Sequence, residues 1–386
     1  MDKSLSARLL VFGLMVSCIA LARDASAASL PSSTSEILQK LKLDPSVLTN
    51  IDKELQVPKE WIDKAKQEGK VKILSTSSTV NPTELKKFYG SFKERYPFIQ
   101  IDQSGASVQV RAIKTLLSYK NGRVITDIVT NLEHTFHDFK EAGALDDLRN
   151  IPDWNVIPDG SKGSDGSWVS PGVRHYCLAY NTNLVAPKDL PKKWEDLLKN
   201  PAWGNGNLGL VNRPQNWVLG LWRAKGTNWS KEYLTALFRD QKPQLRKEGM
   251  NAMLELAAAG EFHGAVPAQS NLVSQMLERG APLSFSCPEP IPVTRSEFVL
   301  LKGAENPYAA RIFINWLLSA EGQISQFYAR SVPPAHKGLN LKELVPFGEQ
   351  IIGKELSNDD PVFEREEGPE IFAFWNNLWM HKGKPQ

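Results

Sequence analysis

The stretch that decides the fold is KVKILSTSSTVNPTELKKFYGSFKERYPFIQIDQSGAS, residues 70–107. Residues 71–74 are a short apolar run of strand length, and residues 98–101 are a second one. Between them, apolar residues recur at helical spacing from Pro82 through Arg95. This order of strand, helix and strand is typical of a parallel β-sheet covered by helices, so it predicts an α/β fold.

The alternation of strand and helix patterns continues along the chain. A helical pattern at 108–121 leads to a strand-like run at 124–130. Later apolar runs of strand length lie at 175–181, 208–211, 264–267, 283–287 and 297–301. A long helix is predicted from Pro307 to about Tyr328.

Two lobes are predicted, one of them inserted into the other. A turn-rich passage separates the first run of β–α units from a second run of the same kind. We place the first lobe at 70–175 plus 295–386 and the inserted second lobe at 176–294. Each lobe is expected to hold a mainly parallel sheet flanked by helices, and an N-terminal arm and helix at 28–69 precede both.

Composition excludes two classes of protein. The chain has 386 residues, with 46 Lys and Arg against 43 Asp and Glu, for a net charge of +3. Nucleic-acid-binding proteins carry a concentrated basic excess, and disordered chains have high charge and little apolar content. With 41% hydrophobic and 23% charged residues, this chain is predicted to be globular and not to bind nucleic acid.

The first 27 residues are predicted to be a signal peptide. Lys3 and Arg8 precede an apolar run at 9–22, and Ala25-Ser26-Ala27 follows as a small-residue cleavage site. The run is too short for a confident membrane span, which needs about 20 apolar residues. We therefore expect export, cleavage near Ala27 and a soluble mature protein, with a lipid anchor at Cys18 as the alternative.

Two cysteines remain after the signal peptide, Cys177 and Cys287. Both lie in apolar, strand-like runs, where free cysteines pack as small hydrophobic side chains. We expect two buried thiols, and a disulfide between them is the alternative that an exported protein permits.

Hydroxyl and amide residues gather where the predicted strands of the first lobe end. Thr76 and Ser77 follow the first strand, Ser107 the second and Asn131 the third. Ligands of α/β proteins bind at the carboxyl ends of parallel strands, so these four residues are candidate ligand contacts. Each of them also suits the ordinary role of a helix cap.

One pair of histidines is a candidate metal site. His134 and His137 are three residues apart and would share one face of a helix, and exposed histidines at a helix start are the alternative. The sequence has no GxSxG, Walker or HExxH motif, and the GxGxxG at 204–209 precedes a strand where a dinucleotide site would follow one. We predict neither catalysis nor a cofactor.

Four segments together resemble a known family. They lie in order along the chain and read WIDKAKQEGKVKIL at 61–74, LAYNTNL at 178–184, LPKKWEDLLKNPAW at 190–203 and NPYAARIFINWLLSAEGQ at 306–323. This set resembles the extracellular solute-binding proteins of bacterial ABC importers, particularly the ferric-iron-binding branch, over most of 58–335. The resemblance implies a two-lobed periplasmic binding fold of type II, with hinge crossovers that we place near 175–181 and 283–301.

The resemblance also implies where a ligand binds. Iron-binding members carry two adjacent tyrosines on a segment that corresponds to 264–282, which here contains no tyrosine and offers Gln269 and Asn271 instead. Neutral amides do not replace the charge of two phenolates, so bare ferric-ion binding is not expected. The loop for the accompanying anion corresponds to 212–216, where Asn212 and Arg213 stand. Arg213 suits a carboxylate or phosphate, or else a nearby acid on the surface.

The sequence thus predicts a monomeric periplasmic receptor. It would bind a small anionic or polar ligand between two lobes and deliver it to an ABC permease in the inner membrane. The alternatives are a receptor for ferric iron or an iron complex, a receptor that feeds a sensor, and an exported hydrolase.

Overall fold

The computed structural model describes residues 30–76 and 81–383. The predicted signal peptide, Cys18 and Ser77 lie outside these residues. Within them, every helix is too short or too polar to cross a lipid bilayer.

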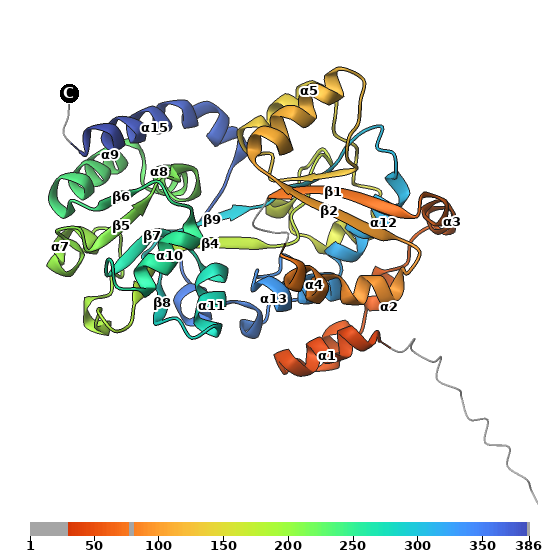
Figure 1. Cartoon of the computed structure of the whole chain (residues 1–386), viewed down its shortest axis with the longest axis horizontal. Helices are drawn as coiled ribbons and strands as arrows, with labels where there is room; N and C mark the ends of the chain where they lie inside the picture. The colour runs from red at the N-terminus through yellow and green to blue at the C-terminus, as the bar shows by residue number, and fades with distance from the viewer. Residues whose placement is uncertain (1–29, 77–80, 384–386) are drawn as a thin grey trace, which may run out of the picture. The chain divides into compact units, whose positions relative to one another are not determined.

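The first sheet of the described chain has four strands in the order β10-β3-β1-β2. Strands β1 and β2 lie side by side in Figure 1. Strands β1 (Lys70–Thr76), β2 (Gln100–Ala106) and β3 (Ile128–Thr130) are parallel, and β10 (Phe298–Leu300) runs antiparallel to β3. This sheet is mainly parallel, as the β–α alternation predicts.

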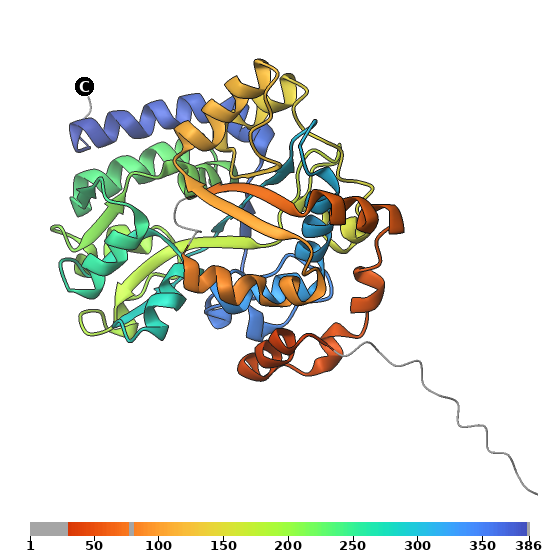
Figure 2. The same ribbon diagram turned by 45° about the vertical axis from the view of Figure 1, so that its right-hand side comes forward.

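Four helices pack their apolar faces around this sheet: α3 (Lys59–Glu68), α4 (Pro82–Arg95), α12 (Pro307–Leu318) and α13 (Ala320–Arg330). Helices α4 and α13 lie side by side in both views (Figure 1 and Figure 2). The single long helix predicted from Pro307 is two helices, because Ser319 is extended and its hydroxyl accepts a hydrogen bond from the Gly322 amide at 3.2 Å. Ser319 is therefore the N-cap of α13.

The second sheet has seven strands. They are β11 (Leu356–Asn358), β9 (Ile291–Arg295), β4 (Val173–Asn181), β7 (Gly264–Gln269), β5 (Leu208–Val211) and β6 (Gln244–Arg246) in spatial order, with β8 (Leu283–Ser286) paired to β4. Strand β4 runs antiparallel to its partners β7, β8 and β9, whereas β5 is parallel to β6 and β7. The sheet is therefore mixed, and the prediction of a mainly parallel sheet is confirmed only for the first lobe.

Five helices flank the second sheet: α8 (Val218–Lys225), α9 (Thr227–Ala236), α10 (Met250–Ala258), α11 (Ser270–Glu278) and α15 (Pro361–His381). The remaining α-helices are α1 (Ser32–Leu41), α2 (Ile51–Glu54), α5 (Thr115–Lys120), α6 (Phe136–Glu141), α7 (Asp196–Lys199) and α14 (Gly348–Ile351).

The last helix, α15, packs against the core of the second sheet (Figure 1). Its fully buried Trp375 lies 5.9 Å from the ring of Trp217 and 5.4 Å from that of Phe238. The sequence pattern predicts that all of 295–386 belongs to the first lobe. For α15 this prediction is wrong, because the helix packs on the second sheet. The buried ring, and not the order of the chain, determines where the helix docks. The other lobe boundaries stay a prediction.

Two antiparallel segments carry the chain between the sheets. Val169 and Phe298 exchange backbone hydrogen bonds beside the first sheet, and Val173 then pairs with Arg295 in the second. The second predicted crossover, at 283–301, includes this passage. The first crossover lies earlier in the chain than predicted, because 175–181 is already inside the second sheet.

Cys177 and Cys287 form a disulfide with 4.9 Å between their Cα atoms. The prediction of two free thiols is therefore wrong. The two cysteines meet because β4 pairs with β8. This pairing aligns Leu178 with Ser286, the residues next to Cys177 and Cys287 in sequence.

The N-terminal arm docks on the first lobe through charged and hydroxyl groups. The backbone amides of Ser32 and Ser33 donate to the Glu94 carboxylate at 2.7 and 3.0 Å. Glu54 of α2 accepts from the Ala320 amide at 2.8 Å and lies 3.4 Å from His336. The arm is thus an ordered part of this lobe.

A buried acid beside the arm makes stability depend on pH. Asp153 is 3% exposed, and burial, together with the charge of Glu54, raises its pKa to about 8. Because the unfolded pKa is about 4, the folded state holds the extra proton between these two values, and stability falls as pH rises through this window.

We expect Asp153→Asn to flatten the change in unfolding free energy between pH 5 and pH 8, measured in urea. Asp159→Asn changes an exposed carboxyl nearby and serves as the control, which should keep the wild-type slope. An Asp153→Asn protein with the full wild-type slope would refute this assignment.

Candidate ligand-binding cavity

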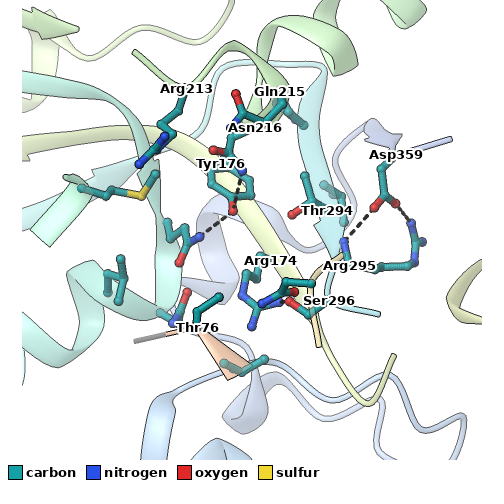
Figure 3. Close-up of a pocket in the computed structure, with 18 of the residues that line it drawn as sticks. Thr76, Arg174, Tyr176, Arg213, Gln215, Asn216, Thr294, Arg295, Ser296 and Asp359 are labelled. Carbon is teal, nitrogen blue, oxygen red and sulfur yellow. Dashed lines mark hydrogen bonds and ion pairs between the residues drawn. The ribbon is translucent and has the colours of Figure 1, made fainter. Parts of the chain in front are cut away.

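A cavity of about 860 Å³ lies where the two sheets meet. The first sheet and its helices contribute Thr76, at the end of β1, and Asn131, just after β3. The second contributes Tyr176 from β4 and Arg213 from the loop after β5. In Figure 3, Thr76 lies on one side of Tyr176, and Arg213 lies on the other.

The cavity brings together five of the eight predicted ligand contacts, namely Thr76, Asn131, Arg213, Gln269 and Asn271. Two of the remaining three do not line it. Ser107 is exposed, and its backbone carbonyl accepts from the Arg111 amide at 2.8 Å at the start of a helical segment. The side-chain oxygen of Asn212 accepts from Trp375 Nε1 at 2.7 Å. Ser77, the eighth, lies outside the described residues.

The two histidines do not form part of a larger metal-binding group. His134 is exposed, and His137 Nε2 lies 3.2 Å from the Pro361 carbonyl oxygen. Among residues 30–76 and 81–383, no three His, Cys, Asp or Glu side chains stand close enough to hold a metal ion.

Tyr176 anchors the wall that the second sheet contributes. Its hydroxyl accepts hydrogen bonds from Asn216 Nδ2 at 3.0 Å and from Gln269 Nε2 at 2.5 Å (Figure 3). Burial raises the pKa of Tyr176, so the phenol keeps its proton at neutral pH. Sequence reasoning missed this residue, because it stands in an apolar run that gives no sign of which side chains face a ligand.

Six arginines line the cavity, and three of them are ion-paired. Arg295 pairs with Asp359, Arg223 with Asp360 at 3.1 Å and Arg330 with Glu84 at 3.8 Å. In each pair the positive and negative charges largely neutralise each other, so these residues mainly shape the walls of the cavity.

The other three arginines, Arg174, Arg213 and Arg279, have no ion pair with any described residue. Arg174 is mostly buried, in β4 at the crossing between the sheets, and donates to the hydroxyl of Ser296. Burial lowers its pKa, since a desolvated charge is costly. Arg213 and Arg279 are exposed. The cavity thus holds guanidinium groups that form no ion pair with a carboxylate of the described chain.

Two of the carboxyl groups in the cavity also lack an ion pair with a described residue. Burial and the charges of Asp359 and Glu364 raise the pKa of Glu297 to about 8, and burial and Asp359 raise that of Glu364 to about 7. Near pH 7, Glu297 is therefore mostly neutral and Glu364 is partly so. The negative charge that opposes Arg174 and Arg213 is correspondingly reduced.

Comparison with known proteins gives the family. Residues 125–346, more than half of the chain, match the model of the bacterial extracellular solute-binding protein family. No curated protein matches the chain in sequence.

Solved structures of two-lobed binding proteins share the fold. Iron-bound HitA from Pseudomonas aeruginosa superposes with a TM-score of 0.64 at 21% identity, over 80% of this chain and 99% of that one. An ABC transporter substrate-binding protein from Bradyrhizobium japonicum superposes with a TM-score of 0.65 at 18% identity, over 82% of this chain and 100% of that one. The protein MotA from A. tumefaciens in complex with glucopine superposes with a TM-score of 0.61 at 17% identity, over 80% of this chain and 99% of that one. Both the predicted α/β, two-lobed fold and the resemblance are confirmed, and the chain belongs to the family of bacterial extracellular solute-binding proteins.

Proposed function

We propose that this solute-binding protein is the periplasmic receptor of an ABC importer and that its solute is a small organic anion. The observation that carries the choice of ligand is the pair Arg174 and Arg213, which line the cavity without an ion pair among the described residues. A mostly buried guanidinium is costly unless an anion accompanies it. A carboxylate or phosphoryl group accepts two parallel hydrogen bonds from an arginine and supplies that charge.

Residues from both lobes would hold the anion. Thr76 and Asn131 come from the first lobe, and Arg213, Gln269 and Asn271 come from the second. A ligand that contacts both lobes binds the closed form more tightly than the open one, and this difference drives closure at the crossing segments. The permease in the inner membrane then distinguishes the loaded receptor from the empty one.

Ferric iron is the first alternative ligand, because the HitA structure is that of an iron-bound protein. Against it stand the absence of tyrosine from 264–282 and the state of Tyr176. The Tyr176 hydroxyl already accepts two hydrogen bonds, and its raised pKa opposes the phenolate that Fe(III) needs. The second alternative, an exported hydrolase, would consume the ligand on prolonged incubation.

The location follows from the same proposal. The family implies an exported protein, and we propose the periplasm, with cleavage near Ala27 and a monomeric mature chain.

A melting-temperature screen of organic anions and ferric salts tests the proposal. We expect an organic carboxylate or phosphoryl compound to stabilise the protein, and Arg213→Gln to weaken its binding by about tenfold, since hydrogen bonds to charged groups contribute about 1.5–3 kcal/mol. Arg123→Gln changes an exposed arginine outside the cavity and is the matched control. Stabilisation by ferric ion alone, with none by any organic anion, would overturn the proposal.

A further inference from the structure

The cavity has both arginines and carboxyl groups that form no ion pair with a described residue. Besides Arg174 and Arg213, the carboxyl groups of Glu297 and Glu364 line it without an ion pair to any described residue. Glu297 stands between β9 and β10, and Glu364 stands in the first turn of α15. The other carboxylates of the cavity each have an arginine within 4 Å, which for Glu133 is Arg111 at 3.0 Å.

Neighbouring acids reinforce the negative potential at these two carboxyls. Asp359 and Glu133 act on both of them, and with burial they keep the pKa of Glu297 near 8 and that of Glu364 near 7. A cation brought into this part of the cavity would relieve the repulsion and favour the ionised form of both groups.

Two buried amide oxygens provide an independent observation. Asn271 Oδ1, on α11 of the second lobe, and Gln326 Oε1, on α13 of the first, line the same cavity and have no hydrogen-bond donor in the described chain. Their side chains are only 5% and 4% exposed. Leaving a buried acceptor without a hydrogen-bond donor costs about 1–3 kcal/mol of free energy. A ligand that donates a hydrogen bond to each of these oxygens would remove this cost.

We infer that the ligand is a zwitterion of the amino-acid class, with its acidic end toward Arg174 and Arg213 and its ammonium group on Glu297 and Glu364. Its remaining N–H or O–H groups satisfy the oxygens of Asn271 and Gln326. An anion that carries only hydroxyl groups would satisfy these two oxygens but would leave both carboxyls without a cation. The inference rests on the proposed function and narrows its ligand class.

The test begins with a melting-temperature screen of the standard amino acids against the mature protein. The best binder is then compared by calorimetry with two acids of the same skeleton, in which hydrogen or hydroxyl replaces the ammonium group. Aspartate, succinate and malate are one such series. We expect the amino acid to bind at least about tenfold more tightly than either analogue, since removing one partner of a buried charge pair costs about 2–5 kcal/mol.

Variants locate the ammonium site. Glu297→Gln and Glu364→Gln should each weaken binding of the amino acid by about tenfold or more and leave the analogue with hydrogen nearly unchanged. Glu141→Gln changes an exposed carboxyl outside the cavity and should behave as wild type. Calorimetry near pH 7.5 in buffers of different ionisation enthalpy should detect proton release on binding, because the ammonium group favours ionised Glu297.

The inference and the proposed function fail in different ways. If an analogue binds as tightly as the amino acid, or if no standard amino acid stabilises the protein while another organic anion does, the zwitterion is wrong and the anion receptor stands. If no organic acid of any kind stabilises the protein, both are wrong. Unchanged amino-acid affinity in Glu297→Gln and Glu364→Gln, each with a normal melting temperature, would also overturn the inference.

Discussion

Replacing Arg174 by glutamine is expected to weaken ligand binding by about a hundredfold or more, because truncating a buried partner of a charge pair costs about 2–5 kcal/mol. Arg174 lies in β4 at the crossing between the sheets, and its only hydrogen bond in the described chain goes to the neutral hydroxyl of Ser296. The anion would be its principal counter-charge, so removing the guanidinium removes the main electrostatic attraction at the hinge. Calorimetry with the anion that stabilises the wild type most provides the measurement.

Two further variants separate this explanation from general damage. Arg174→Lys keeps the charge but loses the two parallel hydrogen bonds, so an intermediate affinity is expected. Arg123→Gln removes an exposed arginine outside the cavity and should change affinity little. An Arg174→Gln protein that melts normally and binds the anion as wild type does would exclude Arg174 from the site.

Loss of the disulfide is expected to cost about 3–5 kcal/mol of unfolding free energy, because closing a loop of about 100 residues restricts the unfolded chain by this amount. Cys177 and Cys287 are 110 residues apart in sequence, so their bond closes most of the second lobe into one loop. The double variant Cys177→Ala and Cys287→Ala, unfolded in guanidinium chloride, gives the measurement.

Wild-type protein unfolded with a reducing agent is the control for the side chains. Reduced wild type should have nearly the same unfolding free energy as the double variant. The unfolding free energy of the double variant should not change when the reducing agent is added. A double variant as stable as the oxidised wild type would mean that the bond contributes nothing to the folded protein.

Local periodicity is sufficient to predict the first β–α–β unit of the first lobe. Residues 71–74 lie in β1, and residues 98–101 end inside β2, which begins at Gln100. The helical pattern that begins at Pro82 is helix α4. Strand ends are likewise sufficient to find Thr76 and Asn131 at the cavity, since the carboxyl ends of parallel strands meet at one edge.

Features that depend on long-range packing are not predictable in this way. Arg174 and Tyr176 are two residues apart in the apolar strand β4, and both line the cavity. The local sequence gives no sign that this strand passes the cavity. The partner of Cys177 is fixed by the pairing of β4 with β8, and the docking of α15 by the cluster around Trp375. Asn212 has the position of a ligand contact in the sequence, but the indole of that same Trp375 takes its side-chain oxygen.

The most direct test of the central claim is a crystal structure of the protein with the organic anion that stabilises it most. We predict one molecule in the cavity between the sheets, with an acidic group within about 3 Å of the guanidinium group of Arg174 or of Arg213. A metal ion bound there without an organic anion, or an acidic group that contacts neither arginine, would contradict it.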